Sequence, residues 1–207
     1  MKEALINKTM SNINKYYKYD NVKLNEIRYG LETFYITIFK LIVLFLISFF
    51  IHTTKELCLL FLFYGLLRLT GFGLHANKSI ICWILSIMIF SVIPFIIKNV
   101  TFFPSVLYIV SLILTILIIV YAPADTKKRP LISKKKRLVF KVLSSITAII
   151  YTLMIYFIKI IYYKYLLLFS LLLEVLLILP ISYKILGLSY NNYKSYKRKE
   201  VKNEISS

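Results

Sequence analysis

Six long apolar stretches, each almost uninterrupted by charge, constrain this chain more than any other feature of its sequence. Each is 17–21 residues long, which is enough for a helix rising about 1.5 Å per residue to cross a hydrocarbon core about 30 Å thick. The stretches predict helices, because lipid offers no partner for unpaired backbone groups and the alternation of a membrane β-barrel is absent. They are Phe34–Ile51, Leu57–Leu74, Ile80–Ile97, Ser105–Ala122, Leu138–Ile158 and Tyr165–Ile181.

Composition supports a membrane protein and excludes a soluble domain. Hydrophobic residues make up 59% and charged residues 17% of the 207, with a mean hydropathy of +0.74. A soluble domain has about 45–50% apolar and about 25% charged residues, and a disordered chain has fewer apolar ones still. The two cysteines, Cys58 and Cys82, lie inside or beside apolar stretches and make no disulfide framework. We therefore predict an all-α, polytopic membrane protein with about six transmembrane helices.

The distribution of Lys and Arg predicts the orientation in the membrane. The net charge is +18, and 21 of the 27 basic residues lie in segments that are cytoplasmic if the N-terminus is cytoplasmic, against four in the outer loops. Cytoplasmic loops carry the excess of basic residues, so both termini are predicted to be cytoplasmic. We interpret these charges as topology determinants facing the cytoplasm and anionic lipid, not as a nucleic-acid surface.

The same pattern divides the chain into three parts. Residues 1–32 are predicted to form a cytoplasmic arm or interfacial helix, without the features of a removed signal peptide. Residues 33–188 are expected to form the six-span membrane domain, and residues 189–207 a basic cytoplasmic tail.

The connection between the second and third stretches concentrates the polar chemistry of the chain at a predicted cytoplasmic membrane edge. It contains one of the two histidines, His75, one of the two cysteines, Cys82, and two of the five glycines, Gly71 and Gly73. On one unbroken helix, His75 and Cys82 would lie about 10.5 Å apart along the axis, so a thiolate nucleophile with an imidazole partner requires a break. The glycines permit that break.

A helix that begins just before Cys82 would also favour catalysis. With Ser79 as the N-cap residue, Cys82 falls in the first turn, where the helix dipole and unpaired N–H groups favour a thiolate and can stabilise an oxyanion. A structural interpretation stays open beside it, in which His75 makes a hydrogen bond at the membrane edge and Cys82 is a small buried hydrophobe. Spacing alone does not decide between the two.

Other polar residues have simpler interpretations. Cys58 has no histidine nearby in sequence and is interpreted as a packing residue. Arg68 and Glu174 are costly in or near hydrocarbon. Arg68 is close to the interface, which its side chain can reach, and ion pairing is the first interpretation of Glu174. The alternatives are that Arg68 binds a substrate carboxylate and that Glu174 orients the imidazole. The basic loop at 124–137 can anchor on anionic lipid and can also receive an acidic partner segment.

Two motifs resemble the accessory gene regulator B (AgrB) family. The first is Gly73-Leu74-His75-Ala76, preceded by Arg68 and followed by Cys82. The second is Ala122-Pro123-Ala124-Asp125-Thr126-Lys127, followed by Pro130, at the end of the fourth stretch. The family often has adjacent glycines before the histidine, whereas Phe72 separates Gly71 from Gly73 here, which leaves the local loop conformation open.

The resemblance implies a cysteine endopeptidase of the bacterial cytoplasmic membrane that processes a quorum-sensing propeptide (AgrD-like). Cys82 would be the nucleophile and His75 its base, with no metal, no cofactor and no assignable third member. The propeptide's own cysteine would then displace Cys82 from a thioester and close a thiolactone ring. The residues expected to shape the loop or oxyanion site are Gly71 and Gly73. Those expected to bind the acidic C-terminal tail of the propeptide are Arg68, Lys127, Lys128 and Arg129.

The alternative from a different class is a non-enzymatic small transporter or signalling scaffold. A transporter predicts symmetry-related helix breaks in the two halves of the chain, and the break at Gly71 and Gly73 has no counterpart in the second half. The sequence leaves open the propeptide and cleaved bond, the ring size, peptide export and the oligomeric state, a homodimer included. It also leaves open whether the second and third stretches cross fully or are re-entrant.

Overall fold

The computed structural model describes residues 2–16, 19–74, 79–99, 104–126, 130–194 and 196. His75 and the basic residues Lys127, Lys128 and Arg129 lie outside this set. The chain divides into two compact units, residues 1–52 and residues 53–207.

The first unit is a pair of helices, α1 (Lys2–Tyr16) and α2 (Asn21–Phe50). The 30-residue α2 begins well before the predicted first span, because the polar residues of its first turns form helix as readily as the apolar ones that follow. On that polar part, Arg28 and Glu32 form an ion pair at 3.5 Å, four residues apart on the helix surface.

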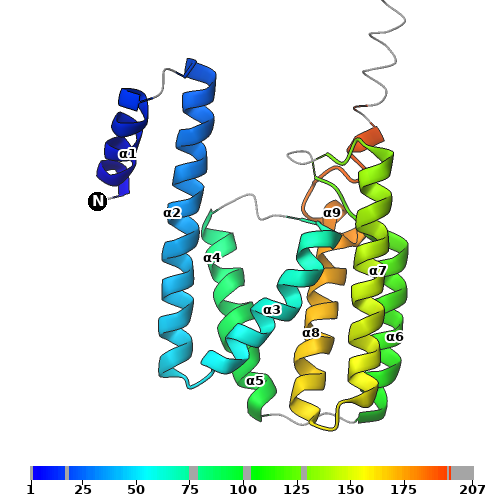
Figure 1. Cartoon of the computed structure of the whole chain (residues 1–207). Coiled ribbons are helices and arrows are strands. Elements are labelled where there is room, and N and C mark those ends of the chain that lie inside the picture. Colours follow the sequence, from blue (N-terminus) through cyan, green and yellow to red (C-terminus); the bar gives the residue numbers. More distant parts are fainter. Residues whose placement is uncertain are drawn as a thin grey trace, which may run out of the picture. The chain divides into compact units, whose positions relative to one another are not determined.

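The second unit contains the remaining helices (Figure 1). They are α3 (Thr54–Gly71), α4 (Ser79–Ile87), the π-helical turn η1 (Met88–Val92), α5 (Ile93–Asn99), α6 (Pro104–Tyr121), α7 (Lys134–Phe157), α8 (Ile161–Ile178) and α9 (Pro180–Ile185). The π-helical turn lies just before Pro94, which has no backbone N–H and whose ring collides with the carbonyl four residues earlier in a regular helix. The backbone N–H of Ile93 accordingly bonds to the carbonyl of Met88, five residues back.

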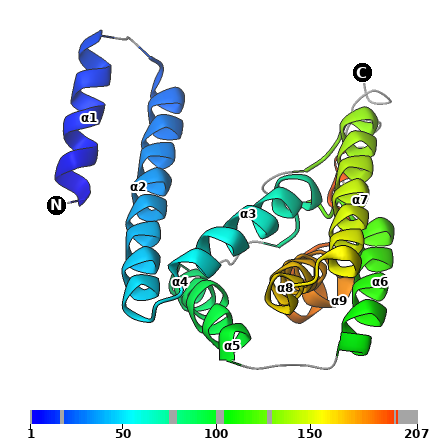
Figure 2. The same cartoon turned by 60° about the horizontal axis from the view of Figure 1, so that its bottom comes forward.

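Helix α8 is the centre of this unit. It packs against α3, α6 and α7, and the view of Figure 2 shows it enclosed by these helices. Its buried face includes Leu167, Leu171 and Ile178, all with no exposed surface. Between α6 and α7, the hydroxyls of Thr115 and Thr152 lie 2.6 Å apart and hydrogen-bond to one another.

The outward faces of the helices are apolar, as expected in lipid. Among the described residues, three helical segments are long and apolar enough to cross a membrane, namely Lys23–Phe50, Lys134–Phe157 and Ile161–Ile178. Two shorter apolar ones there are Cys82–Lys98 and Ser105–Tyr121. Ile109, Ile116 and Val120 of α6 are each more than half exposed, and exposed apolar surface of this kind marks a contact with membrane or with protein. The all-α membrane fold is thus confirmed. The number of crossings and the cytoplasmic termini stay predictions.

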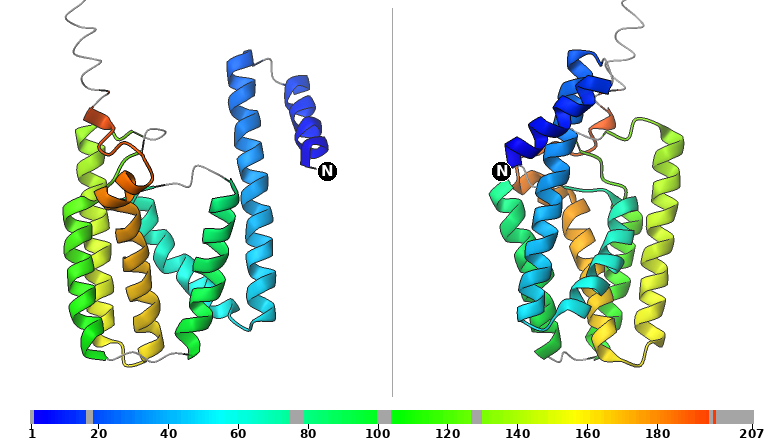
Figure 3. Two further views of the ribbon diagram at one scale, coloured as in Figure 1. Left: turned by 180° about the vertical axis from the view of Figure 1, so that it is seen from behind. Right: turned by 60° about the vertical axis from the view of Figure 1, so that its left-hand side comes forward.

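One end of the second unit gathers segments that are far apart in sequence. The C-terminus of α3, the start of α4, the loop between α6 and α7, and α9 all lie at the end opposite the α7–α8 connection (Figures 1 and 3). Arg68, Gly71, Gly73 and Cys82 fall at this end, and the segment after α3 bridges to Ala124 in the connection that follows α6.

Candidate functional site

Cys82 lies in the first turn of α4, as the sequence predicts. The helix begins at Ser79, so Cys82 is its fourth residue. Its side chain is half-buried and its sulfur forms no disulfide. The Ser86 hydroxyl donates a hydrogen bond of 2.7 Å to the Cys82 carbonyl. Cys58, the other thiol, is exposed on α3.

The segment that leads towards Cys82 leaves α3 at Gly71 and is held by backbone hydrogen bonds on two sides. Phe72 and Gly73 have positive φ values of 62° and 88°. The Gly73 N–H donates to the Ala124 carbonyl at 2.7 Å and the Ala124 N–H to the Gly71 carbonyl at 3.0 Å, which forms a parallel bridge. The Leu74 N–H donates to the Leu177 carbonyl of α8 at 2.9 Å. The chain is therefore fixed up to the residue before His75.

Arg68 holds the same segment from inside. Its Nη2 donates to the Gly73 carbonyl at 3.2 Å and to the Leu74 carbonyl. Its Nη1 is buried and has no hydrogen-bond partner among the described residues. These contacts favour a positioning role for Arg68, and its predicted contact with a propeptide tail stays a prediction.

Both glycines of the segment lie in close packing. A Cβ on Gly71 would lie 2.1 Å from Oε1 of Glu174. A Cβ on Gly73 would lie 2.7 Å from both Arg68 Nη1 and the Leu177 carbonyl oxygen, and its positive φ also disfavours a side chain. The loop-shaping role expected of the pair stays a prediction. The Gly73 N–H already donates to Ala124, so an oxyanion role for it would require that bond to open.

Glu174 lies on α8 beside this segment, and sequence reasoning did not find its contact with Gly71. Its side chain has no exposed surface. Neither carboxylate oxygen has a hydrogen-bond partner among the described residues, and no described basic side chain forms an ion pair with it. Ion pairing, the first interpretation from the sequence, is therefore not observed within hydrogen-bond reach.

Asp125 anchors the loop between α6 and α7 to the C-terminal segment. Its buried carboxylate accepts the N–H groups of Asn192 at 2.9 Å and Tyr193 at 2.8 Å. The Tyr183 hydroxyl donates to the Asp125 backbone carbonyl at 3.1 Å. Burial, and next the Asp125 carboxylate, hold the pKa of Tyr183 well above its usual range. Tyr183 is therefore a permanent hydrogen-bond donor at physiological pH.

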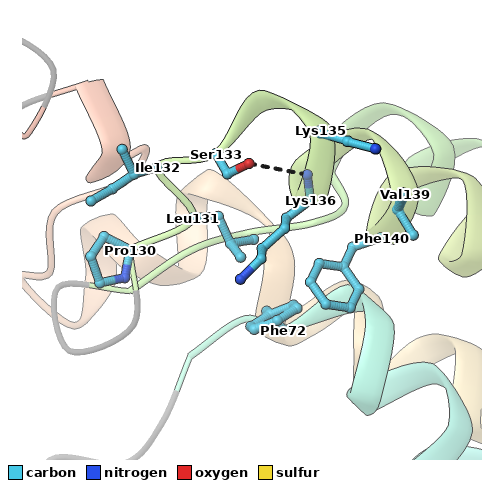
Figure 4. A pocket seen from close by; sticks show the side chains of 9 residues that line it. All are labelled: Phe72, Pro130, Leu131, Ile132, Ser133, Lys135, Lys136, Val139 and Phe140. Carbon is cyan, nitrogen blue, oxygen red and sulfur yellow. Dashed lines mark hydrogen bonds between the residues drawn. The ribbon is translucent and has the colours of Figure 1, made fainter.

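A pocket of about 890 Å³ opens beside this loop. Figure 4 shows the side chain of Lys136 reaching over the pocket towards Phe72, while that of Lys135 points away. The Phe72 and Phe140 rings pack edge to face, with their centroids 4.9 Å apart. The pocket thus combines an apolar base with a basic side chain, which suits an anionic group attached to an apolar body. The lining residues are Phe72, Pro130, Leu131, Ile132, Ser133, Lys135, Lys136, Val139 and Phe140.

These features define a helical membrane protein with a polar site at one end of its bundle and a cysteine in the first turn of a helix at that end. A family model described as Accessory gene regulator B matches residues 6–178, and the chain belongs to this family. It therefore has a role in the accessory gene regulator quorum-sensing system.

Relatives match along most of their length. A putative AgrB-like protein of Clostridium acetobutylicum is 33% identical over 194 residues, which cover 90% of this chain and 89% of that protein. A putative AgrB-like protein of Listeria welshimeri is 32% identical over 174 residues, or 83% and 84% of the two chains. Accessory gene regulator protein B of Staphylococcus aureus is 30% identical over 164 residues, or 78% and 86%. No solved structure matches the chain.

Proposed function

We propose that this protein is a multi-pass cysteine endopeptidase of the bacterial cytoplasmic membrane that cleaves a quorum-sensing propeptide (AgrD-like). Cys82 is the nucleophile and His75 the general base and acid. The observation that carries the proposal is the position of Cys82 in the first turn of α4, directly after a segment whose entry at Leu74 is held by α8 and Arg68. Family membership supports the same assignment.

The first chemical step makes a thioester. The Cys82 thiolate attacks a peptide carbonyl, the C–N bond breaks, and the protonated His75 imidazole gives its proton to the departing amine. The first turn of α4 favours the thiolate, because its backbone N–H groups and the helix dipole stabilise negative charge. The C-terminal part of the propeptide leaves as a peptide with a new amino terminus.

The second step releases the enzyme. The propeptide's own cysteine thiolate attacks the thioester carbonyl, the bond to Cys82 breaks, and a thiolactone ring closes while the Cys82 thiolate is regenerated. One thioester replaces another, so the step is nearly balanced in free energy. Hydrolysis would compete with it in open solvent, and a site at the membrane edge limits that competition by excluding water.

The basic end of the molecule is the proposed binding surface for the acidic C-terminal tail of the propeptide. The pocket at Lys136 and Phe72 supports this by its chemistry, and Lys127, Lys128 and Arg129 follow one another directly before its wall at Pro130. Basic side chains steer an acidic peptide and fix its register. The same surface also contacts anionic lipid headgroups.

Trapping the intermediate tests the proposal. Purified protein is mixed with a propeptide whose own cysteine is replaced by serine, and the intact protein mass is measured. We expect an adduct of the propeptide's N-terminal part on Cys82, which hydroxylamine removes, and no adduct on Cys82→Ala. An adduct on Cys82→Ala, or cleavage of the propeptide by Cys82→Ala, would contradict the mechanism.

A further inference from the structure

We propose that Glu174 is a positioning residue of the catalytic centre, and that it acts through Arg68 and the backbone of residues 71–74. It sets the place at which the chain enters the segment containing His75. The inference rests on the proposed function, because it assigns a role within that reaction.

The first argument is the cost of a buried carboxylate. Glu174 has no exposed surface and lies within a helix long and apolar enough to cross a membrane. Such a group is costly to bury without partners, and charged side chains in spans commonly have a functional reason. Asp125, the other buried carboxylate at this end of the described chain, has its oxygens engaged by backbone N–H groups. Glu174 has no comparable structural task.

The second argument is the pair of buried groups that lack partners. The positive charge that acts on Glu174 is the Arg68 guanidinium. Arg68 Nη1 and both Glu174 oxygens are buried without hydrogen bonds in the described part of the chain. Arg68 Nη1 and Glu174 Oε1 also face the same short segment, the first at Gly73 and the second at Gly71. A carboxyl group on this side attracts the guanidinium and orients it.

The third argument is where that orientation acts. The orientation of the Arg68 guanidinium determines the position of Nη2, which donates to the carbonyls of Gly73 and Leu74. Leu177, three residues after Glu174 on the same helix, accepts the Leu74 N–H. His75 follows Leu74 at the fixed spacing of about 3.8 Å between consecutive Cα atoms. A shift of Leu74 therefore displaces the backbone from which His75 begins.

The expected result is a loss of rate without a loss of substrate binding. Glu174→Gln keeps the shape of the side chain and replaces the carboxyl group with an amide that cannot ionise. We expect it to lower kcat for propeptide cleavage by about tenfold to 10²-fold, the effect of misplacing a catalytic group by up to about 1 Å, with KM unchanged. The Arg68→Gln, Glu174→Gln double variant should lose no more than the worse single variant, because both residues act through one contact.

A second readout separates positioning from general destabilisation. In a Cys58→Ser background, the rate of Cys82 alkylation by iodoacetamide at pH 7 reports whether the imidazole supports the thiolate. Glu174→Gln should slow alkylation towards the rate measured for His75→Ala. The rates of the variants and of the unmodified protein should become equal at a pH well above the usual thiol pKa of about 8.5. The matched control is Glu56→Gln, since Glu56 is a buried carboxylate on α3 at the helix end away from Gly71. It should change neither kcat nor the alkylation rate.

Failure of this inference differs from failure of the proposed function. Unchanged kcat and unchanged alkylation in folded Glu174→Gln, with Cys82→Ala inactive, would overturn the positioning role and leave the peptidase intact. Cleavage by Cys82→Ala would overturn both. If Glu174→Gln does not fold, Arg68→Lys takes its place, since lysine keeps the charge but cannot donate to both carbonyls as the planar guanidinium does. Unchanged kcat in that variant would equally overturn the role.

Discussion

At the scale of single residues, the site depends on two glycines that are needed for different reasons. Gly71 is the last residue of α3 and has ordinary helical backbone, so its constraint is space beside the Glu174 carboxylate. Gly73 combines a positive φ of 88° with contacts to Arg68 and Leu177. A side chain at Gly73 would therefore meet backbone, whereas a Cβ at Gly71 requires the Glu174 carboxylate to move.

Replacing Gly71 by alanine should destabilise the protein. The new Cβ would lie 2.1 Å from Glu174 Oε1, so either the carboxylate or the segment must move. Overpacking of this kind costs about 1–3 kcal/mol, and we expect Gly71→Ala to lower the unfolding temperature in detergent. Its cleavage rate should fall as well, because the displaced segment precedes His75.

The matched control for Gly71→Ala is Gly65→Ala, which lies on the same helix, α3. A Cβ on Gly65 meets nothing within 4 Å, so Gly65→Ala should leave activity unchanged and stabilise the helix by up to about 1 kcal/mol. Equal unfolding temperatures for Gly71→Ala and Gly65→Ala would contradict the packing described at Glu174.

At the scale of elements, Asp125 joins three parts of the chain that are distant in sequence. It follows α6, and its carboxylate binds the backbone of Asn192 and Tyr193 beyond α9. The preceding residue, Ala124, bridges to the end of α3. The loop between α6 and α7 thus holds both the C-terminal segment and the segment leading to His75.

Asp125→Asn tests this junction. An amide presents one acceptor oxygen and one donor group where two N–H donors converge, and it removes the charge that strengthens both hydrogen bonds. We expect a loss of about 1.5–3 kcal/mol of stability and faster proteolysis of the C-terminal segment. Glu26→Gln, a change on an exposed residue of α2, should affect neither. Equal proteolysis of the Asp125→Asn and unmodified proteins would show that the junction does not hold the C-terminal segment.

Helices and the break after α3 were predictable from sequence, but the contacts between elements were not. Apolar length and the glycines at 71 and 73 indicated where helices run and where α3 ends. The parallel bridge of Phe72 with Ala124 joins residues 52 positions apart, and no local pattern signals such a pairing. The contact of Glu174 with Gly71 depends on how α8 is rotated against α3, which the uniformly apolar sequence of α8 leaves unspecified. The only signal for Glu174 was the cost of its charge in a span.

At the scale of the whole molecule, the distribution of basic residues predicts one orientation in the membrane. The described basic residues near the site include Lys135, Lys136 and Arg137. At the other end of the second unit, the α7–α8 connection carries Lys159 and the first turn of α8 carries Lys164. Lys164 is buried and donates to the Tyr108 hydroxyl at 2.7 Å, so its charge is partly screened there. The site end is expected to face the cytoplasm.

Reporter fusions test this orientation. Alkaline phosphatase, which is active only outside the cytoplasm, should be inactive when fused at the C-terminus and active when inserted at residues 158–160. A fluorescent protein that matures in the cytoplasm should give the reverse pattern. Active phosphatase at the C-terminus would contradict the predicted topology and would place the proposed site on the wrong face for a cytoplasmic propeptide.

The most direct test of the peptidase is mass spectrometry of the cognate propeptide co-expressed with the protein and its cysteine variants. We expect the C-terminal fragment to be lost with the unmodified protein and with Cys58→Ala, and to be retained with Cys82→Ala and His75→Ala. A product lighter by one water than the linear cleaved peptide would show ring closure. Cleavage by Cys82→Ala, or intact propeptide in every sample with the protein folded in the membrane, would contradict the account. The second result would favour a transporter or signalling scaffold instead.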